Sequence, residues 1–130
     1  MVDEKRIKQL LLDITEAINK QNIDEYMKGF HKDVIIIAPG TPIIKGIQAW
    51  RSFLDGVFQY ITPIEYDEIL VKASDSGDWG YCIADYLAVE NPPSGRTEAR
   101  ERLHCTVVKD GEEWKITAFS WNVEWKKTYA

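Results

Sequence analysis

Three polar residues at alternate positions, Arg100, Arg102 and His104, are the side chains of this sequence best suited to chemistry. Residues two apart on a β-strand share a face, so a strand here would set two guanidinium groups beside an imidazole. Arginine holds an anionic or carbonyl oxygen through charge-assisted hydrogen bonds, and histidine exchanges a proton near neutral pH. The row therefore predicts a site that binds an oxygen-bearing small molecule and moves a proton.

A carboxylate from the preceding strand is expected to join this row. If the strands over about 78–90 and 97–109 form a hairpin centred between Pro93 and Ser94, residues whose numbers sum to 187 lie opposite one another. Asp85 then faces Arg102, and cross-strand neighbours share a face. We expect Asp85, Arg102 and His104 to form the catalytic set, with Asp85 orienting the arginine or the histidine. A slip of one residue would move Asp85 to the opposite face. The same register predicts the pairs Ile83–His104, Leu87–Arg100 and Cys82–Cys105.

The same residues also have a purely structural interpretation. Buried charges are normally paired, so an Arg102–Asp85 pair with a hydrogen-bonded His104 could fill the mouth of a cavity and do no chemistry. A third arrangement leaves the whole row in solvent. Which face of the strand is covered decides between these possibilities.

The composition narrows the class of protein. A chain of 130 residues with 45% hydrophobic content predicts a single domain over residues 1–130, able to bury a core without metal or disulfides. A net charge of −5 argues against nucleic acid as a partner. The two cysteines lack metal-binding spacing, so we expect no metal and no cofactor. No apolar run is long enough for a signal peptide or a membrane span, which predicts a cytoplasmic protein with no membrane partner.

The positions of the apolar residues predict helices first and strands afterwards. Apolar residues at three- and four-residue spacing predict helices over about 3–20 and 22–30, and a third that begins at Gly46 and runs to about Val57. The β-branched run over 34–40 predicts a buried strand that ends in a Pro-Gly turn. Four strands follow, over about 61–73, 78–90, 97–109 and 113–124, separated by turn-forming residues. This order predicts an α+β fold with helices on one face of an antiparallel sheet.

Two stretches carry a resemblance to a known family: NIDEYMKGFHKDVIIIAPGTPIIKGI over 22–47 and WKITAFSWN over 114–122. With the order of elements, they resemble the NTF2-like superfamily, in its SnoaL-like, ketosteroid-isomerase-like and DUF4440-type branch. The resemblance implies a cone in which three N-terminal helices pack on a curved, mostly antiparallel β-sheet around a cavity. The superfamily hosts isomerases, dehydratases, hydrolases, cyclases and assembly domains, so the fold leaves the activity open.

The catalytic positions of ketosteroid isomerases can be transferred one at a time. The general base would fall at Ala38, the hydrogen-bonding tyrosine at Ile14, and the protonated carboxylic acid at His104. Two of these three positions are apolar, so we expect no ketosteroid isomerase activity. The resemblance further implies a cavity lined by Phe53, Thr117, Phe119 and Trp121, and Arg100 is expected to contribute to ligand binding.

Two functional hypotheses follow. The first is an isomerase, dehydratase or cyclase that acts, without a cofactor, on a small organic molecule with a carbonyl or anionic oxygen. The second is a non-enzymatic dimeric domain whose cavity is filled by its own side chains. An open cavity that reaches His104 would favour the first hypothesis. In either case we expect a homodimer through the apolar face of the sheet, because so large a patch is seldom exposed on a monomer. That patch comprises Cys82, Ala84, Tyr86, Ala88, Leu103, Cys105 and Val107.

Overall fold

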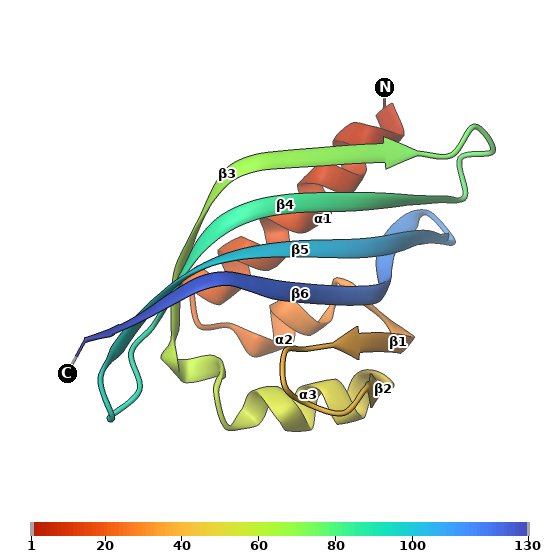
Figure 1. Ribbon diagram of the computed structural model, residues 1–130. Coiled ribbons are helices and arrows are strands. Elements are labelled where there is room, and N and C mark those ends of the chain that lie inside the picture. Colours follow the sequence, from red (N-terminus) through yellow and green to blue (C-terminus); the bar gives the residue numbers. More distant parts are fainter. Residues whose placement is uncertain (1, 130) are drawn as a thin grey trace.

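A six-stranded sheet curves around a group of helices in the computed structural model, which describes residues 2–129 apart from the side chains of Thr62 and Pro63 (Figure 1). The helices are α1 (Val2–Asn19), α2 (Ile23–Met27) and α3 (Ile47–Asp55), followed by a 3-10 turn, η1 (Phe58–Tyr60). The strands are β1 (Phe30–Ile37), β2 (Ile44–Lys45), β3 (Ile61–Ala73), β4 (Trp79–Glu90), β5 (Arg96–Asp110) and β6 (Glu113–Tyr129). The structure confirms the predicted α+β class, and adds the short strand β2 and the turn η1.

The helices form where apolar spacing and caps coincide. One stripe of α1, including Ile7, Leu11 and Ile14, is buried against the sheet. At the start of α2, the Asn22 side chain accepts a hydrogen bond from the Glu25 backbone N–H at 3.1 Å. The helix was predicted to run to residue 30, but it ends at Met27, because Phe30 already belongs to β1.

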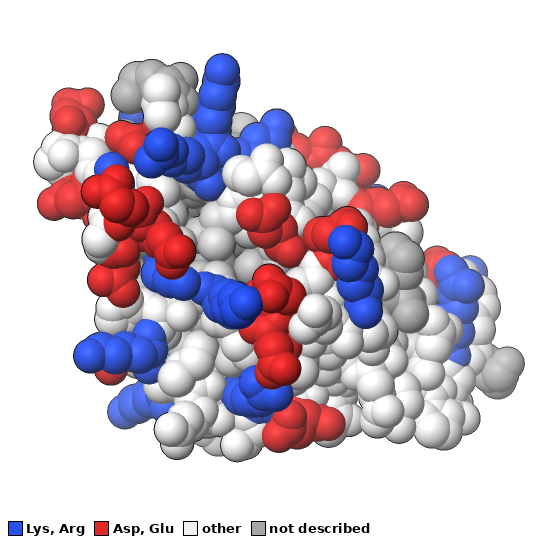
Figure 2. Space-filling view, turned by 180° about the vertical axis from the view of Figure 1, so that it is seen from behind, with Lys and Arg blue, Asp and Glu red and all other residues white. Residues whose placement is uncertain are grey.

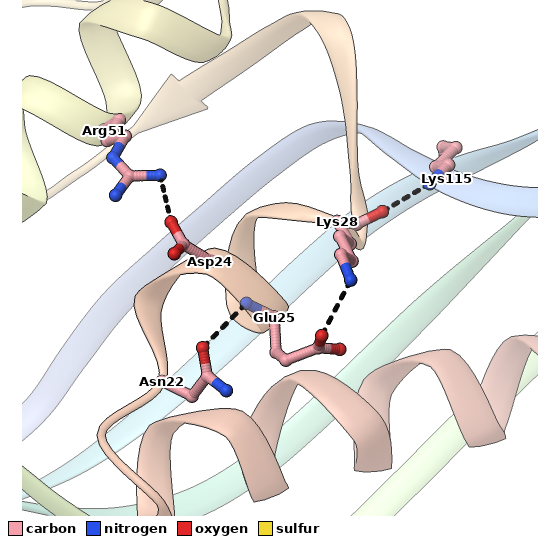
Figure 3. A network of polar contacts seen from close by, with 6 residues as sticks. All are labelled: Asn22, Asp24, Glu25, Lys28, Arg51 and Lys115. Carbon is pink, nitrogen blue, oxygen red and sulfur yellow. Dashed lines mark hydrogen bonds and ion pairs between the residues drawn. The ribbon is translucent and has the colours of Figure 1, made fainter.

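One ion pair and one hydrogen bond join α2 to neighbouring elements, and a second ion pair lies within the α2 segment itself (Figure 3). Asp24 pairs with Arg51 of α3 at 2.6 Å, and Lys28 pairs with Glu25 at 2.7 Å. The ammonium group of Lys115, on β6, donates to the backbone carbonyl of Lys28. These contacts fix the short helix that supplies Tyr26 to the core. Seen from the helical side, basic and acidic side chains are interleaved over the surface (Figure 2).

Strands β3 to β6 form an antiparallel meander, and the sheet order is β2-β1-β6-β5-β4-β3. The sheet is not wholly antiparallel, because β1 lies parallel to β6. The hairpin of β4 and β5 has the predicted register, in which Asp85 lies opposite Arg102 and Ile83 opposite His104. β3 has the predicted bounds, whereas β6 runs five residues further than expected, to Tyr129.

The face of the sheet that the helices cover is the opposite of the one expected. Leu103, Cys105 and Val107 were predicted to point away from the pocket, but they are buried in the main core with Ile7 and Leu11 of α1. The reason is that helices bury the more apolar face of a sheet. We call this covered side the inner face and the other side the outer face. The patch predicted to form a dimer interface is therefore not available to a partner. Within residues 2–129, no helix is long and apolar enough to cross a membrane.

Candidate active site

A cavity of about 190 Å³ lies between the helices and the inner face of the sheet. Every one of the three helices and four of the strands contribute to its wall. The exposed residues Val57 and Glu90 mark the end that meets solvent. The cavity is thus not filled by the protein's own side chains, and it is lined by Ile14, Thr15, Ile18, Tyr26, Trp50, Phe53, Leu54, Val57, Ile61, Ile64, Tyr66, Tyr86, Ala88, Glu90, Glu101, Leu103, Phe119 and Trp121.

Aromatic side chains form one wall of this cavity. Trp50 stacks on Phe53 with ring centroids 5.8 Å apart, and Trp121 lies 6.2 Å from Trp50. Phe119 meets Trp121 edge to face at 5.8 Å. The Trp50 side chain is almost fully buried, and its indole N–H has no hydrogen-bond partner among the described residues. A buried donor without an acceptor is what an oxygen atom of a ligand could satisfy.

A carboxyl group lies on the inner face, where it meets a tyrosine. Glu101 of β5 is opposite Tyr86 of β4, and the Tyr86 hydroxyl donates to Glu101 Oε1 at 2.9 Å. Burial raises the pKa of Glu101 above its ordinary value, although the hydrogen bond from Tyr86 opposes this by stabilising the carboxylate. The pKa of Tyr86 is also raised, mainly by burial and then by the neighbouring carboxylate, so its proton stays in place.

A second tyrosine anchors this pair to the first helix. The rings of Tyr66 and Tyr86 meet edge to face at 5.8 Å, and the Tyr66 hydroxyl lies 2.6 Å from that of Thr15. Thr15 donates its own hydrogen to the Leu11 carbonyl, so Tyr66 is the donor to Thr15. Burial raises the pKa of Tyr66 to about 12. Tyr66 thus serves to hold Tyr86 in position, and Glu101 is the group of this cluster whose raised pKa makes it a candidate for proton exchange.

The predicted catalytic row lies on the outer face, away from this cavity. Arg102 and His104 are exposed, and Arg102 pairs with Glu124 at 3.0 Å. Asp85 faces Arg102 in the register, but its ion pair is with Arg100 at 3.6 Å. Arg102 and His104 do line a separate depression of about 390 Å³. The structure therefore brings the row together as predicted but places it on the side of the sheet opposite the cavity.

Three of the five predicted ligand-binding residues line the cavity, namely Phe53, Phe119 and Trp121. Arg100 does not, because it belongs to the outer face. Thr117 does not either, since the pairing of β5 with β6 shifts at this point: Ala118 lies opposite Thr106 while Ile116 lies opposite Val107. A bulge of this kind inserts one extra residue and cannot be read from side-chain alternation.

The sequence reasoning missed two polar residues that line the cavity, Glu101 and Tyr86. A signal for Glu101 was present, because it is the one charged residue among the alternate positions Ala99, Glu101, Leu103, Cys105 and Val107. Burying a carboxyl group within an apolar face costs free energy, so a residue of this kind is a candidate for a functional role. The predicted register also placed Tyr86 opposite it. Within residues 2–129, no three histidine, cysteine or acidic side chains are grouped so that they could hold a metal ion.

A model of the SnoaL-like domain matches residues 7–120, so the chain belongs to that family. The resemblance to the NTF2-like superfamily is thereby confirmed, while its DUF4440-type branch stays a prediction. No curated protein matches the chain.

Solved structures share the fold at low sequence identity. A candidate scytalone dehydratase from Novosphingobium aromaticivorans has a TM-score of 0.86 at 16% identity, over 99% of this chain and 89% of that one. A ketosteroid isomerase-like protein from Erwinia carotovora atroseptica has a TM-score of 0.80 at 16% identity, over 95% and 97%. The hexachlorocyclohexane dehydrochlorinase LinA-type3 from Novosphingobium barchaimii has a TM-score of 0.83 at 14% identity, over 97% and 89%. At such identities the likeness concerns the fold alone.

Proposed function

We propose that the protein binds a small ring-shaped organic molecule in the inner cavity and transfers a proton to or from it through Glu101. The observation that carries this proposal is the Glu101 carboxyl group, held by Tyr86 at 2.9 Å inside a cavity lined mainly by apolar and aromatic side chains. An apolar cavity of about 150 Å³ is known to bind benzene, so about 190 Å³ suits a substituted ring. The family's structural neighbours include proteins named for dehydration, dehydrochlorination and isomerisation, which are all proton-transfer chemistries.

Burial makes the Glu101 carboxylate a stronger base than one in water. In the proposed reaction, it takes a proton from carbon, and the electrons of the broken C–H bond form a double bond. If a leaving group departs from the adjacent carbon, the result is an elimination. If the electrons instead move onto a carbonyl oxygen, Glu101 can return the proton to another carbon, which is an isomerisation. The unpaired Trp50 indole N–H supports a role in binding that oxygen.

A neutral aromatic probe tests the proposal without knowledge of the natural substrate. 5-Nitrobenzisoxazole opens to a cyanophenolate when a base removes its carbon-bound proton, and absorbance reports the product. We expect the native protein to accelerate this opening, with a rate that rises as Glu101 loses its proton. Glu101→Gln should lower the rate by about a hundredfold or more. Glu112→Gln, which removes the same charge from the exposed β5–β6 turn, is the matched control. Equal rates for the native protein and Glu101→Gln would refute the role of Glu101.

The predicted outer-face set is a second candidate. The depression lined by Arg102 and His104 supports binding of an anionic or carbonyl oxygen there, with Asp85 on the adjacent strand. If this site binds such a ligand, Arg102→Met should abolish the binding. His104→Phe should remove the pH dependence of the binding between about 5 and 8. The exposure of both residues favours the inner cavity instead.

We also retain the homodimer as a proposal, now through the outer face. Leu70, Trp79 and Ile83 on this face are 50%, 49% and 40% exposed, which is unusual for large apolar side chains gathered on one side of a sheet. A dimer is compatible both with an enzyme and with the alternative of a non-enzymatic ligand-binding or assembly domain. Light scattering at tens of micromolar should give twice the mass of one chain, and Ile83→Asp should give one chain. A native monomer would exclude the dimer.

A further inference from the structure

The charged groups that line the inner cavity have one sign. Glu90 and Glu101 are acidic, and no lysine, arginine or histidine is among the lining residues that the structure describes. Arg100, Arg102 and His104 of β5 lie on the outer face instead. An anionic ligand in the inner cavity would therefore meet two carboxylates and no cation.

Glu90 lies at the mouth of the cavity. It follows Tyr86 and Ala88 at alternate positions of β4, so the three residues share the inner face. Its side chain is exposed, and a group bound to it would keep part of its hydration. This lowers the cost of holding a charge there, because removal from water is the main penalty of a buried ion pair. Glu90 and Glu101 also act on each other, since the charge of Glu90 raises the pKa of Glu101.

A basic group also acts on Glu101, but it does not cancel the effect of Glu90. Lys126 of β6 lowers the pKa of Glu101, but its influence is smaller than the opposing influence of Glu90. Lys126 is exposed and is not among the residues that line the cavity. Of these two charges, the acidic one therefore has the larger effect on Glu101.

The aromatic wall of the cavity adds a second attraction for cations. The faces of aromatic rings carry partial negative charge and attract cations within about 6 Å. Trp50, Phe53 and Trp121 line the cavity with such rings, and so do Tyr66 and Tyr86. Aromatic faces and carboxylates together are a combination that favours an organic cation over a neutral molecule of the same shape.

We propose that the substrate of this cavity carries a protonated amine on a small ring, with the ammonium group toward Glu90 at the mouth and the ring against Trp50, Phe53 and Trp121. This inference rests on the proposed function, because it concerns the same cavity. The ammonium group at the mouth leaves Glu101 free to act on a C–H bond of the ring. The substrate class differs from the one predicted from the sequence, since the anionic oxygen expected at Arg102 has no counterpart inside the cavity.

Three ligands of similar shape and different charge test this directly: benzylamine, benzyl alcohol and benzoate. Their affinities for the native protein can be measured at pH 7.5 by calorimetry or by chemical-shift titration. We expect benzylamine to bind at least tenfold more tightly than benzoate and several-fold more tightly than benzyl alcohol. The preference should weaken as salt is raised, because Glu90 is exposed. Equal or tighter binding of benzoate would overturn the proposal, and so would the failure of all three ligands to bind.

A pair of variants tests whether Glu90 is the residue responsible for the preference for benzylamine. Glu90→Gln should lower the affinity for benzylamine several-fold and leave that for benzyl alcohol unchanged, whereas Glu112→Gln should change neither. If the two variants behave alike, Glu90 is not the anchor and the proposal is wrong. The opening of 5-nitrobenzisoxazole reports separately on Glu101, because that probe carries no positive charge. Charge-selective binding without proton transfer would refute the proposed function alone, and proton transfer without charge selectivity would refute this inference alone.

Discussion

The two faces of β5 carry charged residues in different physical surroundings. On the outer face, Arg102 is half exposed and pairs with Glu124, and His104 is open to water. On the inner face, Glu101 lines the same cavity as Leu103 and Tyr86, and its pKa is raised. The comparison teaches that the more numerous charges of this strand are not the ones that line the cavity. Exposed ion pairs contribute little to stability, whereas an apolar cavity changes the proton affinity of a carboxyl group because it removes that group from water.

The largest difference between the faces should appear in stability. Leu103→Ala would leave a void in the core and is expected to lower the free energy of unfolding by about 2–5 kcal/mol. Arg102→Ala, one residue away, removes an exposed ion pair and should cost less than about 1 kcal/mol. Urea denaturation of both variants measures the two costs. Similar costs for the two variants would mean that the faces are not as different as their burial indicates.

A smaller effect is expected from loss of the hydrogen bond that supports the inner carboxylate. Tyr86→Phe keeps the ring but removes the donor to Glu101, so the free energy of unfolding at pH 7.5 should fall by about 1–3 kcal/mol. Because this bond lowers the pKa of Glu101, the variant should have a higher pKa at that residue. The pH midpoint of 5-nitrobenzisoxazole opening should therefore move upward. A midpoint that is unchanged or lower would show that Tyr86 does not control the carboxyl group.

The smallest effect concerns the dependence of stability on pH. The pKa of Glu101 is higher in the folded protein than in the unfolded chain, so the folded state binds more protons between the two values. The contribution of Glu101 to stability is thus present below its ordinary pKa and is lost as the pH rises through the raised value. Glu101→Gln removes this titration.

Urea denaturation of the native protein and Glu101→Gln at pH 4 and pH 7.5 tests the sign. The variant should compare more favourably with the native protein at pH 7.5 than at pH 4. Glu112→Gln, on an exposed turn, should show no such change and serves as the control. A difference that stays constant with pH would contradict the raised pKa.

Much of the local structure could be predicted from the sequence. The bounds of β3 and the register of the β4–β5 hairpin were correct because alternation and turn-forming residues are local properties of the chain. The same alternation grouped Arg102 with His104, and Leu103 with Cys105 on the opposite side. Three aromatic residues of the cavity, Phe53, Phe119 and Trp121, were predicted by resemblance to the family.

Alternation alone could not determine which face of β5 would meet the helices. It separates Arg102 from Glu101 but is the same whichever side is covered, so the choice depends on the packing of α1, α2 and α3 against the whole sheet. That packing buried the face with Leu103 and carried Glu101 and Tyr86 into the cavity with it. The bulge at Thr117 likewise arises from the pairing of two strands and not from either strand by itself. The sequence thus determined which side chains lie together, and the tertiary structure decided which of them left water, because burial depends on every element that packs against a face.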